Sequence, residues 1–179
     1  MKTFCTLAII SITMTLAIPV LTFAQPAPAD EQVSFTERNL GGPRIGITFI
    51  PGDNAITREL AKSKIKNTLS QFGWHFEYVV APQGGGPAFV VEFVPLVAGV
   101  EYGTLIPSAT LALGIRLPSG IEFGVGPNIL IGPKASTALV VAVGKSFNYS
   151  GVSIPLNFVW VTNPAGNRFG IMFGYSIGK

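Results

Sequence analysis

Apolar and polar residues alternate along most of this chain from about residue 72 to its end. The two faces of the final segment are Phe169, Ile171, Phe173, Tyr175 and Ile177 on one side and Arg168, Gly170, Met172, Gly174 and Ser176 on the other. A period of two residues indicates β-strands. The pattern recurs in segment after segment, and no long helical segment could cover so many apolar faces. It therefore predicts an all-β fold closed into a barrel whose apolar outer face meets lipid.

Eight segments resemble strands that cross a bilayer obliquely, which takes about 9–11 residues, although the first is marginally short. Turn residues such as Gly84-Gly85-Gly86 separate successive segments, and these links are too short for crossover helices. We therefore predict an eight-stranded antiparallel up-and-down transmembrane β-barrel. Its strands are expected near residues 43–50, 70–81, 87–100, 104–117, 120–131, 135–147, 151–162 and 167–178.

Side-chain parity divides the residues of these strands into an outer and an inner set. The outer set is aromatic and aliphatic and includes Trp74, Phe76, Tyr78, Phe93, Leu113, Phe123, Leu139, Phe158 and Trp160. The inner set contains nearly every charge in the middle of a strand, and Lys145, on the outer parity, lies close to a strand end. An arginine or lysine facing lipid at the midplane costs roughly 2–4 kcal/mol, so this bias supports the orientation.

One segment departs from the strand pattern. Between Pro51 and Gln71 apolar residues recur at helical spacing, and Asp53 or Asn54 is suited to cap the N-terminus. This predicts one amphipathic helix over 53–69, in the first connection, with a basic face formed by Arg58, Lys62, Lys64 and Lys66. Such a helix lies on anionic headgroups or folds over the barrel mouth as a lid or partner site. Alternatively, it packs its apolar stripe on the rim of its own barrel.

The first residues have the features of an export signal. Lys2 provides the positive start, residues 7–21 are largely apolar, and Thr22-Phe23-Ala24 is a small-x-small ending. We expect residues 1–24 to be a cleaved signal peptide, residues 25–42 a flexible N-terminal segment and residues 43–179 the barrel domain.

The composition agrees with a membrane-embedded chain. Hydrophobic residues make up 48% of the sequence and charged residues only 12%, with a mean hydropathy of +0.49. The formal net charge is +3, and the basic residues are scattered rather than clustered into the stripe typical of nucleic-acid binding. We therefore expect no nucleic acid among its partners.

The last predicted strand resembles the C-terminal assembly signal of bacterial outer-membrane barrels. The residues that carry the resemblance are Arg168, Gly170, Phe173 and Tyr175. The resemblance implies export, periplasmic chaperoning and insertion by the barrel-assembly machinery, although the chain ends on Ile177-Gly178-Lys179 rather than on Phe. The runs 70–74 and 126–128 are similar to the signature of an uncharacterised family of small exported barrel proteins.

Seven inward residues that carry chemistry could meet in a narrow lumen: His75, Glu77, Glu92, Arg116, Glu122, Asn128 and Arg168. Carboxylates beside a histidine suit an enzyme acting on membrane lipid, with His75, Glu77 and a neighbouring hydroxyl as its working groups. However, eight strands enclose an interior just wide enough for side chains, so mutual pairing of the charges is the simpler interpretation.

The His-x-Ser-Asn run of outer-membrane lipid A deacylases is absent. No His, Cys or Asp spacing suggests a metal site, and no cofactor is expected.

These patterns predict a small outer-membrane barrel of a Gram-negative bacterium, with a side-chain-filled lumen and a structural or interaction role. Expected partners are outer-membrane lipids and, during biogenesis, the barrel-assembly machinery. Two alternatives stay open: an outer-membrane lipid-modifying enzyme, and a soluble periplasmic barrel that binds an apolar ligand as lipocalins do. The soluble alternative requires aromatic residues inside and charges outside.

Overall fold

The structure is a computed structural model that describes residues 33–131 and 136–178. Its elements are β1 (Phe35–Phe49), α1 (Ala55–Lys62), β2 (Thr68–Pro82), β3 (Ala88–Ala98), the 3-10 helix η1 (Val100–Tyr102), β4 (Ile106–Arg116), β5 (Ile121–Leu130), β6 (Ser136–Tyr149), β7 (Val152–Thr162), β8 (Arg168–Gly174) and β9 (Ser176–Gly178). The predicted signal peptide lies outside the described residues. In the part of the chain that is described, no helix is both long and apolar enough to cross a membrane.

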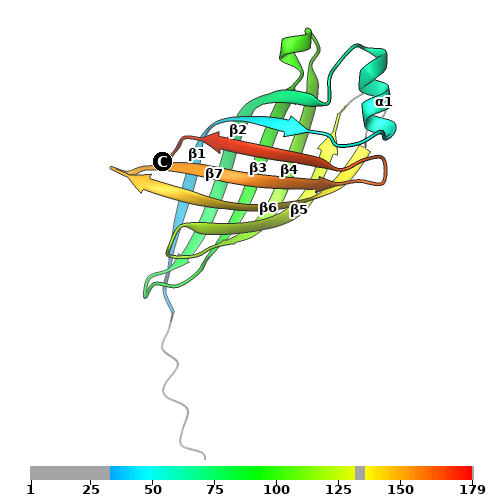
Figure 1. Cartoon of the computed structure of the whole chain (residues 1–179). Helices are drawn as coiled ribbons and strands as arrows, with labels where there is room; N and C mark the ends of the chain where they lie inside the picture. The colour runs from blue at the N-terminus through cyan, green and yellow to red at the C-terminus, as the bar shows by residue number, and fades with distance from the viewer. Residues whose placement is uncertain (1–32, 132–135, 179) are drawn as a thin grey trace, which may run out of the picture. The chain divides into compact units, whose positions relative to one another are not determined.

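The strands form one antiparallel sheet that closes into a ring (Figure 1). Consecutive strands from β2 to β8 pair with each other, and β1 closes the ring by pairing with both β2 and β8. β8 and β9 are two parts of one strand interrupted at Tyr175, because the pairing of Arg44 with Gly174 continues in the same register to Leu40 and Gly178. The predicted eight-stranded up-and-down barrel is therefore confirmed.

The outer face of the barrel is apolar, whereas the inner face carries small and polar residues. On β2, Trp74 and Phe76 are 47% and 51% exposed, whereas His75 and Glu77 are 1% and 4% exposed. The other strands follow the same alternation, with exposed side chains that include Phe93, Leu113, Phe123, Leu139, Phe158 and Ile171. This arrangement is the reverse of a soluble ligand-binding barrel, so the lipocalin-like alternative is wrong.

The first strand begins earlier than the sequence predicts. Residues 35–42, expected to be flexible, extend β1 and pair with the second half of β2, where Phe35 lies opposite Pro82. The sequence of this stretch does not alternate between polar and apolar residues. The prediction was wrong here because hydrogen bonding to β2, rather than a local pattern, keeps the backbone extended.

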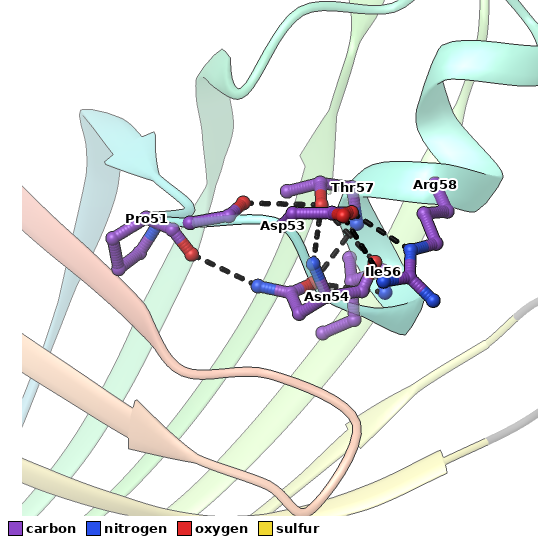
Figure 2. Close-up of polar contacts among 7 residues, drawn as sticks. Pro51, Asp53, Asn54, Ile56, Thr57 and Arg58 are labelled. Carbon is purple, nitrogen blue, oxygen red and sulfur yellow. Dashed lines mark hydrogen bonds and ion pairs between the residues drawn. The ribbon is translucent and has the colours of Figure 1, made fainter.

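Helix α1 begins where predicted, and Asn54 is its N-cap. The Asn54 side chain accepts hydrogen bonds from the backbone N–H groups of Ile56 and Thr57, each at 3.0 Å (Figure 2). In return, the backbone N–H of Asn54 donates to Thr57 Oγ1 at 2.9 Å. This reciprocal capping box satisfies N–H groups that would otherwise lack partners at the start of the helix.

The predicted helix over 53–69 is longer than the observed one, which ends at Lys62. Lys64 takes a positive φ of 58°, which is incompatible with a continuing right-handed helix. Lys64 and Lys66 therefore lie in the connection to β2 and not on the helix. Figure 1 shows α1 at the end of the barrel opposite to the C-terminus. We call these two ends the helix end and the terminal end.

Candidate functional site

Two clusters of apolar side chains lie in the barrel interior, one near each end. The cluster at the terminal end consists of Val79, Ala88 and Val90, with Leu40 and Ala81 packed against it. The cluster at the helix end consists of Ile50, Ile65, Leu69 and Ala98, with Ile56 and Leu60 of α1 packed against it. The apolar stripe of α1 therefore packs on the rim of its own barrel, as one of the two alternatives predicts.

Arg116 joins two glutamates near the terminal end. Its Nη1 lies 2.5 Å from Glu77 Oε1, and its Nε donates to Glu122 Oε1 at 2.6 Å. Glu122 also accepts a hydrogen bond from Ser146 Oγ. Arg116 and Glu122 are directly paired across β4 and β5, so the sheet register brings them together. One guanidinium thus compensates two buried carboxylates, neither of which would be stable there as an isolated charge.

His75 lies between Arg44 and two glutamates. Arg44 Nη2 is 2.6 Å from His75 Nδ1, and Arg44 Nη1 donates to Ser176 Oγ at 3.1 Å. Because a guanidinium only donates, Nδ1 must accept, and the proton of the neutral imidazole lies on Nε2. Nε2 faces Glu77 Oε2 at 3.5 Å and Glu92 Oε2 at 3.7 Å, both beyond hydrogen-bond distance.

A glycine makes room for this arrangement. Gly174 of β8 pairs directly with Arg44, and a Cβ at Gly174 would collide with the Arg44 side chain. In a narrow barrel, a long inward side chain needs a small residue at the paired position of the neighbouring strand. Arg44, His75, Glu77, Glu92, Arg116 and Glu122 together form what we call the charged network.

His75, Glu77 and Glu92 are the described residues that could hold a metal ion, since their ligand atoms lie within 4.8 Å of one another. The contact between Arg44 and Nδ1 opposes this use. A neutral imidazole has one nitrogen lone pair for accepting, and here it faces the guanidinium, not the carboxylates. The arrangement therefore favours a proton on Nε2 between two carboxylates.

The lipid-modifying alternative requires a nucleophile next to the histidine. The described contacts of His75 are with Arg44, Glu77 and Glu92, and no described hydroxyl is hydrogen-bonded to its ring. The geometry thus lacks the paired nucleophile and base from which covalent catalysis begins.

Arg168 and Asn128 form a separate group toward the helix end. Arg168 Nη2 donates to Asn128 Oδ1 at 2.8 Å, and Asn128 Nδ2 donates to Thr110 Oγ1 at 2.9 Å. No described carboxylate forms an ion pair with Arg168. The structure therefore places five of the seven predicted lumen residues in the charged network and the other two in this second group.

A cavity of about 80 Å³ lies between the two groups. Its lining includes Arg44, His75 and Glu92 of the charged network and Asn128 and Arg168 of the second group. The side chains predicted to fill the lumen therefore leave a small cavity at its centre. Small residues cause this, since inward positions such as Ala112 and Ala142 leave space that longer side chains would occupy.

The four basic residues predicted for the membrane surface are all exposed, but only Arg58 and Lys62 form ion pairs with described residues. The Arg58 guanidinium donates to both carboxylate oxygens of Asp53, at 2.7 and 3.0 Å, and Lys62 donates to Glu59 at 2.8 Å. The hydrogen bond from Arg58 lowers the pKa of Asp53 below its ordinary value. Lys64 and Lys66 have no ion pair with any described residue.

No protein-family model and no curated protein matches the sequence. Among solved structures, Ail, the attachment invasion locus protein of Yersinia pestis, matches with a TM-score of 0.50 at 12% identity, over 80% of this chain and 97% of Ail. This chain has the fold of an eight-stranded transmembrane barrel. A second structure of Ail, in complex with the heparin analogue sucrose octasulfate, matches with a TM-score of 0.47 at 13% identity, over the same 80% and 97%. At such identities the likeness concerns the fold alone.

Proposed function

We propose that this protein is a small outer-membrane β-barrel with a structural or interaction role centred on its helix end. The observation that carries the proposal is the combination of an apolar outer face with a narrow interior occupied by apolar clusters and by mutually paired charges. The outer face suits acyl chains, and an eight-stranded interior occupied by side chains opposes the passage of solutes. What remains accessible is the rim, where α1 and its connection to β2 are exposed.

Two sequence features support export and insertion into the outer membrane. Residues 1–24 have the features of a cleaved signal peptide, and the last strand carries the proposed assembly signal at Arg168, Gly170, Phe173 and Tyr175. The barrel-assembly machinery is therefore the expected partner during biogenesis. The decisive test is cell fractionation combined with gel migration before and after boiling. We expect outer-membrane recovery and a boiling-dependent shift; a detergent-free, compact soluble monomer would contradict the proposal.

A further part of the proposal is that the helix end binds anionic lipid headgroups. Lys64 and Lys66 support it, because they are exposed and have no described counter-charge, in contrast to the paired Arg58 and Lys62. Basic residues close to a membrane surface attract anionic lipids.

This contact is testable by titrating the folded barrel with anionic lipid or phosphatidylcholine and counting bound lipids by native mass spectrometry. The double variant Lys64→Gln/Lys66→Gln should bind fewer anionic lipids and the same number of phosphatidylcholine molecules. Lys145→Gln is the matched control, because it removes an exposed cation far from the helix end. If the wild type, the double variant and Lys145→Gln bind the same number of anionic lipids, the two lysines have no role in this contact.

A further inference from the structure

Arg168 is a buried cation without a described counter-charge. It is 8% exposed and uses one of its five N–H donors, in the hydrogen bond to Asn128. Its Nε is buried and has no hydrogen-bond partner. The other two interior arginines differ, since Arg116 contacts two carboxylates and Arg44 contacts His75 and Ser176. A buried charge is strongly unfavourable unless it is paired.

Two cavities meet at this side chain. The central cavity has a volume of about 80 Å³, and a second cavity of about 50 Å³ lies under α1. Four residues line both: Thr48, Gln71, Ser108 and Arg168. Each cavity exceeds the roughly 30 Å³ that one water molecule occupies in the liquid, so a group larger than water fits beside the guanidinium.

The other shared residues offer suitable donors. The side chains of Thr48, Gln71 and Ser108 form no hydrogen bond with another described residue, so their hydroxyl and amide groups are free to turn toward a ligand. No described carboxylate pairs with Arg168 and competes for it. Together with the guanidinium, these groups make a pocket rich in hydrogen-bond donors.

We propose that the junction of the two cavities is a binding site for a small monovalent anion, such as a halide ion or a short carboxylate, held by Arg168. The anion supplies the counter-charge that the protein lacks at this position. The charged network contains two arginines and three glutamates, so with neutral His75 it carries one net negative charge. This excess repels an anion from the terminal end and confines it to the side of Arg168.

The test compares anions of different size at equal ionic strength. The full-length folded barrel, in a nonionic detergent, is melted in sodium gluconate and in increasing sodium bromide. Bromide binding to the native state should raise the melting temperature with a saturable dependence on concentration. Gluconate is too large for the cavities and should have no such effect. Crystals grown in bromide should show an anomalous peak beside the Arg168 guanidinium.

Asn128→Asp is the most informative variant. It places a carboxylate at the position from which Asn128 Oδ1 now accepts the Arg168 hydrogen bond at 2.8 Å, so that Arg168 gains an internal counter-charge. Thr110 Oγ1, which now accepts from Asn128, is able to donate to the new carboxylate by rotating its hydroxyl. We expect this variant to fold and its apparent affinity for bromide to fall at least tenfold.

Arg168→Gln should lose the bromide response as well, and Lys145→Gln, which removes an exposed outer cation, should retain it. If Arg168→Gln fails to assemble, the comparison of the wild type with Asn128→Asp decides the question. The proposal is overturned if the wild type melts at the same temperature in bromide and gluconate. It is equally overturned if Asn128→Asp responds to bromide as the wild type does.

Discussion

The ion pairs inside the barrel and those on α1 have almost the same lengths but very different surroundings. Arg116 lies 2.5 Å from Glu77 with the carboxylate side chain 2% exposed, whereas Arg58 lies 2.7 Å from Asp53 with that side chain 74% exposed. Water screens the outer pair and replaces either partner at little cost, whereas no solvent replaces a lost partner inside. Pairs of equal length therefore differ in what their loss costs: removing one partner of an interior pair is expensive, whereas the surface pairs leave the helix end free to change.

The largest expected effect comes from breaking the inner pair. Arg116→Met leaves the buried carboxylates of Glu77 and Glu122 without their shared counter-charge. The free energy of unfolding should fall by about 3–5 kcal/mol, which is typical when one partner of a buried pair is removed. Urea unfolding of the folded barrel, followed by the fluorescence of Trp74 and Trp160, measures the loss. Adding Glu77→Gln and Glu122→Gln to the same chain should recover much of it, and a single-variant loss below 1 kcal/mol would contradict the comparison.

A second prediction concerns the same charge placed on opposite faces of one strand. Leu139→Arg puts a guanidinium on the outer face and should cost roughly 2–4 kcal/mol, because that face meets lipid. Ala142→Arg puts it on the inner face, next to the central cavity that Glu92 also lines, where a carboxylate is within reach. We expect membrane insertion to fail or slow for Leu139→Arg and to be better tolerated for Ala142→Arg. Similar insertion yields into lipid vesicles would argue against the orientation.

A smaller effect is expected at the start of α1. Asn54→Ala removes the side chain that accepts hydrogen bonds from Ile56 and Thr57, which should destabilise the helix by about 1 kcal/mol. Amide hydrogen exchange should become faster in residues 55–62, with no change in the strands. Faster exchange throughout the barrel would show that the helix and the strands unfold as one cooperative unit.

The smallest effect belongs to the surface pair itself. Arg58→Ala should leave the urea midpoint unchanged within error, because both partners are largely exposed. The pair lowers the pKa of Asp53, so its contribution is present above the ordinary pKa of an aspartate and disappears as the pH falls through the lowered value. Proton NMR titration of Asp53 should therefore show a higher pKa in the Arg58→Ala variant. An unchanged pKa would mean that the pair does not form in solution.

The division between outer and inner faces was predictable from sequence because it depends on parity within each strand. Successive side chains of a strand point to opposite faces of the sheet. Apolar and polar side chains therefore separate along the run Trp74, His75, Phe76 and Glu77. The start of β1 was not predictable in this way, since residues 35–42 lack alternation and owe their extended backbone to pairing with β2. The end of α1 was missed for a similar reason, because the left-handed conformation of Lys64 has no signal in the surrounding residues.

The arrangement of the interior charges needed the sheet register. Parity predicts that Arg116, Glu122 and Arg168 all point inward, but not which of them meet. The structure joins Arg116 to Glu122 through direct pairing of β4 and β5, whereas Arg168 begins its strand at the other end of the barrel. Which inward residues meet depends on where each residue lies along its strand and on the stagger between the strands. Arg44, which approaches His75 Nδ1, joins the network for the same reason.

The seam between β1 and β8 has a consequence for how the molecule is made. Ile47 pairs with Ile171, so the ring is completed only when the first and last strands meet. Until the last strand is in place, β1 has an edge of unpaired backbone groups, and the ring cannot close. Contacts so distant in sequence form slowly. During that delay the open edge is a template for pairing with another chain, so slow closure leaves time for aggregation.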